Sequence, residues 1–346
     1  MKIFIKLVLI AFIFLNLSCT TTTLKTIYPT LSDGKYDSEF PYRSSSEQLQ
    51  QICNTIQRVN CIAFYTSYIF DPAERIKKDN LTNDIIHNKS VKKISFQRTG
   101  AGTATVISND NGYVALLTDA HIVSFPDTIF SYFADTLAES TDYLESVSLR
   151  EAQNNYIAGF PGGSNVEILA IDKEKDLAIL GNKYDQTFSN GLEVFGYPNG
   201  HAKQLEWGTF VYIFGYPLNT QMVSDAIVSS PNCDRFGSFY INAVVNRGFS
   251  GGIVLAIRDG VPNFELVGMI QSIPEESKYF LSPPTSTFNY NPFVPYKGKE
   301  FVQEQENYIY GISKVIPIEN IIDFVRDNMQ SLEGKGYYIK RFFSND

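Results

Sequence analysis

The stretch Gly248-Phe249-Ser250-Gly251-Gly252 decides the fold of this 346-residue chain. It lies between two apolar runs, residues 239–245 and 253–257, that are typical of β-strands. Its glycines indicate a tight turn whose backbone amides are free around the serine hydroxyl. That hydroxyl is a weak nucleophile until a neighbouring base takes its proton. The stretch therefore predicts a histidine and a carboxylate elsewhere in the chain.

Few residues could supply these partners, because the chain contains only 3 histidines. His121 closes the apolar run that begins at Val114, and Asp176 stands directly before the short apolar run 177–180. Asp172, slightly earlier in the chain, is a rival carboxylate. The order His121, Asp176, Ser250 is that of a known serine-protease triad.

Each signal also has a simpler interpretation. A Ser-Gly-Gly sequence alone is usually a turn, and a lone histidine after a strand is more often a core or surface residue. Asp176 alone could cap a turn. His87 and His201 lie in polar segments with no motif beside them, and we expect both at the surface.

Several motifs together resemble those of chymotrypsin-like serine proteases, in particular the bacterial HtrA/Deg branch. The box Thr118-Asp119-Ala120-His121 resembles the family's Thr-Ala-Ala-His box. Residues 100–107 with 112–114, residues 176–180 and residues 214–217 add to the resemblance, which covers about residues 59–325. It implies a catalytic triad of His121, Asp176 and Ser250, an oxyanion hole formed by the amides of Gly248 and Ser250, and neither a cofactor nor a metal.

The resemblance also implies an all-β fold of two six-stranded β-barrels with a C-terminal helix. We place the peptidase domain at 44–331, with the first barrel at about 59–180 and the second at about 209–315. The closing helix is expected at about 317–329, followed by a tail at 332–346. Residues 131–150 could carry a helix inside an insertion, and residues 274–307 read as a long loop of unassigned role. No PDZ-length segment follows, unlike in typical HtrA proteins.

Two positions near the serine bear on activation and specificity. In trypsin-type digestive proteases the residue before the serine is an aspartate that pairs with a new N-terminus, and Phe249 cannot form that ion pair. The resemblance places the base of the primary specificity pocket near Val244 and its wall at Gln271, Ser272 and Ile273. Because none of these is acidic, we expect small or medium apolar residues to be preferred over Lys or Arg.

The N-terminus has the features of a targeting segment. Residues 1–19 combine two lysines with a short apolar core, too short to span a bilayer, and end at Leu17-Ser18-Cys19. This ending resembles a bacterial lipoprotein cleavage box, although Asn16 stands where the pattern prefers an aliphatic residue. An ordinary signal peptide with an incidental cysteine is the alternative. We expect a lipid anchor at Cys19, a tether at 20–43, and a location at the membrane of the cell envelope.

Composition limits the partners. The net charge of −8 argues against a nucleic-acid surface, and the 14% aromatic content suits a β-rich protein. Beyond Cys19, the thiols of Cys53, Cys61 and Cys233 cannot all pair within one chain; the first two could bridge or stay free.

The sequence thus predicts a serine endopeptidase of the bacterial cell envelope that cleaves protein or peptide substrates. The alternative is a catalytically weak or inactive lipoprotein of the same fold that binds a peptide or protein partner.

Overall fold

The computed structural model describes residues 32–134, 140–161, 165–243, 246–272, 275–282, 301–308 and 311–343. The predicted targeting segment, Cys19 and the first part of the tether lie outside these ranges. In the part of the chain that is described, no helix is both long and apolar enough to cross a membrane.

The first half of the domain is a seven-stranded antiparallel sheet with the strand order β4-β5-β1-β2-β3-β7-β6. Alternating or continuous apolar runs form these strands, as their period requires. Their bounds are Ile56–Phe70 for β1, Ser90–Asp110 for β2, Tyr113–Asp119 for β3, Thr128–Ala134 for β4, Ser140–Ile157 for β5, Glu167–Asp172 for β6 and Leu177–Lys183 for β7.

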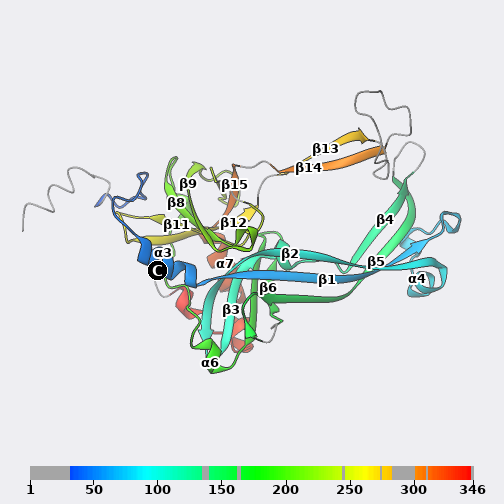
Figure 1. Ribbon diagram of the computed structural model, residues 1–346, viewed down its shortest axis with the longest axis horizontal. Helices are drawn as coiled ribbons and strands as arrows, with labels where there is room; N and C mark the ends of the chain where they lie inside the picture. The colour runs from blue at the N-terminus through cyan, green and yellow to red at the C-terminus, as the bar shows by residue number, and fades with distance from the viewer. Residues whose placement is uncertain are drawn as a thin grey trace, which may run out of the picture.

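Three of these strands are far longer than a usual strand of about five or six residues. β1, β2 and β5 have 15, 21 and 18 residues and continue outward, with β4, as an arm (Figure 1). The helix α4 (Asn83–Lys89) lies at its far end, where a small separate core forms around Phe70, Ile86 and Leu144. The helix expected within 131–150 is wrong, because β4 and β5 occupy that stretch.

The first half is not closed by a continuous ladder. Among the described residues, the end of β5 meets the segment before β6 at the isolated bridge Tyr156–Asn165, where the Val166 amide donates to Asn155 O at 2.7 Å. Only one of the two predicted six-stranded barrels is therefore a closed barrel. The cause is that β1 and β5 extend together into the arm instead of ending at the barrel wall.

The second half is the predicted six-stranded barrel, closed in the order β10-β15-β12-β11-β8-β9. Short apolar strands surround a large core that includes Phe214, Phe239 and Phe264. The strands are β8 (Phe210–Gly215), β9 (Met222–Ser230), β10 (Phe239–Ile241), β11 (Ile253–Ile257), β12 (Phe264–Ser272) and β15 (Ser313–Pro317).

Helices and one hairpin complete the structure. α3 (Ser46–Asn54) precedes β1, and the predicted closing helix is α7 (Ile318–Gly334), which buries Ile321 and Val325. Short helices α5 (Ala120–Val123) and α6 (Gln186–Ser189) follow β3 and β7. Within the stretch expected to be a loop, β13 (Glu275–Ser282) pairs with β14 (Phe301–Tyr308).

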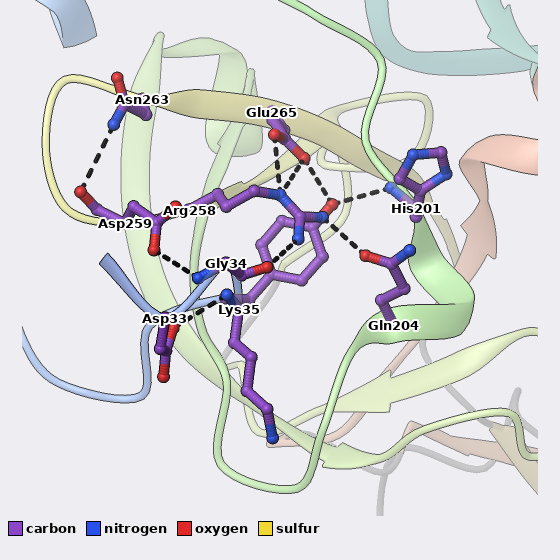
Figure 2. A network of polar contacts seen from close by, with 10 residues as sticks. Asp33, Gly34, Lys35, His201, Gln204, Arg258, Asp259, Asn263 and Glu265 are labelled. Atoms are coloured by element: carbon purple, nitrogen blue, oxygen red, sulfur yellow. Dashed lines mark hydrogen bonds and ion pairs between the residues drawn. The ribbon is translucent and has the colours of Figure 1, made fainter. Parts of the chain in front are cut away.

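The described part of the expected tether packs on the second barrel (Figure 2). Arg258 donates to Gly34 O at 2.7 Å and to the Glu265 carboxylate at 2.9 Å, and Asp259 accepts from the Gly34 amide at 2.8 Å. The Tyr36 hydroxyl donates to Glu265 at 2.6 Å. Residues from 33 onward in this stretch are therefore part of the folded domain.

Candidate active site

His121 stands at the inner end of the first sheet, in the one-turn helix α5 that follows β3. Asp176 precedes β7, the strand that pairs with β3 along its whole length. The pairing of Asp119 with Leu177 at the ends of these strands brings the two residues together. Adjacent strands of one sheet thus present the two side chains side by side.

Both oxygens of Asp176 bind His121. Oδ1 accepts the backbone N–H of His121 at 2.8 Å, and Oδ2 lies 2.8 Å from the ring Nδ1. The Asp176 side chain is 15% exposed and the His121 side chain 47%, so the imidazole has one edge against the acid and the other toward solvent. This arrangement fixes the orientation of the ring and favours a proton on Nδ1, which leaves Nε2 as the free base.

The turn before β7 explains why Asp176 and not Asp172 faces the imidazole. Oδ1 of Asp172 accepts the amides of Glu174 and Lys175 at 2.9 and 3.0 Å and so caps the turn. Asp176 takes a left-handed conformation with φ of 59°, which Asp tolerates better than most residues. The carboxylate of Asp172 therefore stabilises the turn that positions Asp176 and does not bind the imidazole.

Ser250 comes from the second barrel, in the turn that leads into β11. Its carbonyl accepts the amide of Thr103, in β2, at 2.8 Å. On its other side, Gly251 and Gly252 pair with Ile270 of β12 at 2.9 and 2.7 Å. The turn is thus attached to both halves of the domain.

Two glycines permit this close approach. A Cβ on Gly251 (φ 79°) would collide with Thr103 O and lie 2.6 Å from Thr118 Oγ1, and one on Gly102 would lie 2.8 Å from Ser250 O. No side chain fits between β2 and the serine turn. The backbone of Ser250 therefore lies directly against β2, the strand next to β3, which leads to His121.

Thr103 lies at the contact between the two halves of the domain, and none of the sequence motifs gives it a role of its own. Its hydroxyl donates to Gly248 O at 2.7 Å and accepts the amide of Tyr216 at 2.9 Å, while its carbonyl accepts the Thr118 hydroxyl at 2.7 Å. The side chain of Thr103 therefore joins β2 to the serine turn and to the residue that follows β8, and its carbonyl joins β2 to β3. The available signal was its place directly after two closely spaced glycines, Gly100 and Gly102.

The amides expected to bind an oxyanion are those of Gly248 and Ser250. Among the described residues, neither of these amides donates a hydrogen bond. Phe249 between them is 4% exposed and packs in the core of the second barrel beside Gly215. The buried ring of Phe249 thus holds the serine turn on the core of the second barrel.

The serine hydroxyl is not hydrogen-bonded to the imidazole in this arrangement. Within the described part of the chain, Ser250 Oγ has no hydrogen-bond partner, and the residue is partly buried. Catalytic hydrogen bonds are often long without substrate and tighten when it binds. The triad contact between Ser250 and His121 stays a prediction.

The residues named for the specificity pocket are only partly described. Gln271 follows Ile270, whose backbone pairs with the serine turn, and Ser272 ends β12. Val244 and Ile273 lie outside the described residues. The expected wall of the pocket therefore starts next to the serine turn.

Asp119, His121 and Asp176 are of types that also bind metals, and one atom from each lies within 4.8 Å of the others. Tetrahedral Zn²⁺ with bonds of about 2.0–2.2 Å would hold two ligand atoms more than about 3 Å apart. The separation of 2.8 Å between Nδ1 and Oδ2 is instead that of a hydrogen bond. The geometry is that of a His–Asp pair with a second carboxyl beside it.

The thiols contribute nothing to this site. Cys53, Cys61 and Cys233 are all free, and burial raises the pKa of Cys61 to about 12. His87 and His201 are exposed, as expected.

Known proteins show some similarity to this chain in sequence and in structure. Residues 102–269 match the family described as "Trypsin-like peptidase domain". The serine endoprotease from Yersinia pestis is similar in structure, with a TM-score of 0.40 and 18% identity over 84% of this chain and 68% of that one. Deg5 gives a TM-score of 0.40 and 13% identity over 83% of this chain and 97% of that one. No curated protein matches the sequence. The matched stretch, residues 102–269, is thus similar in sequence to a trypsin-like peptidase domain, and it includes His121, Asp176 and Ser250.

Proposed function

We propose that this protein is a serine endopeptidase whose triad is His121, Asp176 and Ser250. The observation that carries the proposal is the double hydrogen bond from His121 to Asp176, in a sheet whose strand β2 holds the serine turn through Thr103. A structural histidine has no need of a carboxylate that fixes both its backbone and its ring. A general base has that need, because its tautomer must be set.

The chemistry follows from the roles of the three side chains. Ser250 Oγ attacks the carbonyl carbon of a peptide bond while Nε2 of His121 takes its proton. Asp176 accepts the Nδ1–H and stabilises the imidazolium that forms. His121 then gives the proton to the leaving amine, and an acyl-enzyme remains on Ser250. Water attacks the acyl-enzyme by the same route and releases the second product.

The negative charge on the tetrahedral intermediate would be held by the amides of Gly248 and Ser250. Removal of one such donor typically costs about 3–4 kcal/mol of transition-state stabilisation. The positive φ of 109° at Gly248 and the hydrogen bond from Thr103 to its carbonyl support a fixed backbone there. We infer that the turn is preformed, since Phe249 anchors it without the ion pair that zymogen cleavage creates.

Substrate and location belong to the same proposal. The absence of an acidic residue at Val244, Gln271, Ser272 and Ile273 favours protein or peptide substrates cleaved after small or medium apolar residues. A lipid on Cys19 would hold the enzyme at the membrane of the cell envelope, because several acyl chains together anchor stably. Cys19→Ser should then move the protein to the soluble fraction, and a soluble wild type without lipid would contradict this part.

The activity is tested by casein hydrolysis with the wild type, Ser250→Ala and the control Ser95→Ala. Ser95 is an exposed serine of the arm. We expect hydrolysis to vanish in Ser250→Ala and to stay at the wild-type rate in Ser95→Ala, with both variants folded. A Ser250→Ala variant that cleaves casein as fast as the wild type would overturn the mechanism. A wild type that binds peptides without cleaving them would favour the partner-binding alternative.

A further inference from the structure

A second carboxyl lies close to the imidazole of His121. Asp119 ends β3 in the box Thr118-Asp119-Ala120-His121, at a position where the family box has alanine. Its side chain is 0% exposed, and its Oδ2 lies 3.8 Å from Nδ1 of His121. The mechanism proposed above does not use it.

This carboxyl has no hydrogen-bond partner among the described residues, at either oxygen. Asp176 and His121 are the titratable groups that face it, from the start of β7 and from α5. The serine turn contributes only the Gly251 amide, which donates to Ile270 O at 2.9 Å, and β2 contributes the uncharged Thr103 beside Thr118. Among the described residues, the cationic group that contacts Asp119 is the imidazole of His121, when it is protonated.

An ionised carboxylate in such a place would be costly. A buried charge needs a partner, and otherwise the group keeps its proton. Burial, and then the nearby charge of Asp176, raise the pKa of Asp119 well above its ordinary value, and the Gly251 amide offsets this only in part.

We propose that Asp119 is a positioning residue that stays protonated in the resting enzyme and supports Asp176 beside His121. This inference rests on the proposed function. A neutral Asp119 fills the buried space next to Nδ1 of His121 and to Asp176 without adding a charge there. An ionised Asp119 would add a second negative charge next to Nδ1, which would hold His121 in its charged form and remove the base.

The substitution Asp119→Asn separates these two states, because asparagine keeps the shape and stays neutral. The probe is the NMR titration of the imidazole nitrogens, for which the exposed His87 and His201 are internal references. We expect the titration midpoint of His121 in Asp119→Asn to match the wild type. A full charge within about 4–6 Å shifts a midpoint by about 1–3 pH units. A fall of that size in Asp119→Asn would show that Asp119 is ionised and would overturn the proposal.

Kinetics test the positioning role. Asp119→Asn should keep the wild-type kcat and KM at neutral pH, whereas Asp119→Ala should lose about tenfold in kcat with KM unchanged. Equal kcat values in the two variants would contradict a positioning role. If the wild type itself proved inactive, the proposed function would fail, yet the imidazole titration would still report the charge of Asp119. Zinc chloride should leave the His121 signals unchanged, and their loss would overturn the proposal in favour of a bound cation.

Discussion

The two halves of the domain differ in whether their sheets close into a barrel. The second half closes six short strands into a barrel and so leaves no free edge. In the described residues of the first half, a single isolated bridge, Tyr156–Asn165, links β5 to the segment before β6, and β1, β2 and β5 extend outward into the arm (Figure 1). The strands that carry His121 and Asp176 do not enter this arm, since β3 pairs with β2 only from Thr105 to Asp110.

The difference shows how the geometry of the site can be kept although the first half carries the long arm. The serine turn needs a rigid support, which the closed barrel and the ring of Phe249 supply. The histidine and its acid need only the pairing of β3 with β7 and the contact through Thr103. We therefore expect changes at this junction to affect catalysis, and changes in the arm to leave it unaffected.

The largest effect should follow from Asp176→Asn. The amide cannot hold the imidazole in the required tautomer, and such a change costs about 10⁴-fold in kcat in a protease with this type of triad. The matched control is Asp172→Asn, which keeps an oxygen for the amides of Glu174 and Lys175. Steady-state kinetics on a peptide substrate should show the large loss only at Asp176. Equal losses at both positions would mean that the acid has been misassigned.

Phe249→Ala should have the next largest effect, on stability. Removal of a buried phenylalanine typically lowers the free energy of unfolding by about 3–5 kcal/mol. The comparison is Phe96→Ala in the arm, where the ring is 37% exposed, and there we expect no more than about 1 kcal/mol. Denaturant unfolding measures both. If Phe96→Ala lowered the free energy of unfolding more than Phe249→Ala, the second barrel would not be the more rigid half.

Thr103→Val should have a smaller effect that still reaches the site. It removes the hydrogen bond to Gly248 O and leaves the Tyr216 amide without its acceptor, at a cost of about 1–3 kcal/mol. Thr105→Val in the same strand is the control, because the Thr105 hydroxyl is buried without a partner and its loss should be neutral or stabilising. Thr103→Val should therefore be less stable and less active than Thr105→Val in unfolding and kinetic measurements. Identical values for the two variants would argue against a role of Thr103 in joining the two halves.

Asp37→Asn should have the smallest effect, and one that depends on pH. Burial, followed by the nearby Glu39, Asp259 and Asp33, raises the pKa of Asp37 to about 6, and the Gly260 amide opposes this. The fold therefore binds this proton more tightly than the unfolded chain does, and the stability it gives is lost as the pH rises from about 4 to about 6. Asparagine avoids that loss.

We expect Asp37→Asn to be more stable than the wild type above pH 6, by about 1 kcal/mol after allowance for solvent screening. The two should be equally stable below pH 4. Thermal unfolding across this range measures the difference. A constant difference at every pH would show that Asp37 does not titrate with folding.

Much of the second barrel could be predicted from the sequence, because each strand is a short apolar run bounded by glycine, proline or asparagine. The arm could not. β5 carries Glu145, Arg150 and Glu151 among polar residues, and this composition suggests a helix when it is considered alone. Its strand conformation is set by pairing with β1, which lies far away in the sequence.

The candidate site was partly open to prediction for a similar reason. His121, Asp176 and Ser250 stand in motifs with fixed spacing, and motif spacing can be read from a sequence. The roles of Thr103 and Asp119 depend on what surrounds them in space. A threonine in a glycine-rich strand and an aspartate before a short helix have many structural uses, and only the fold brings both to one junction.

The central claim is that the closed barrel and the open sheet together make Ser250 a nucleophile. Labelling with a fluorophosphonate probe, followed by mass-spectrometric mapping of the modified peptide, tests it most directly. We predict that the wild type is labelled at Ser250 alone and that His121→Ala, though folded, is labelled far more slowly. A wild type that is not labelled, that is labelled at another serine, or that reacts no faster than His121→Ala would contradict the claim.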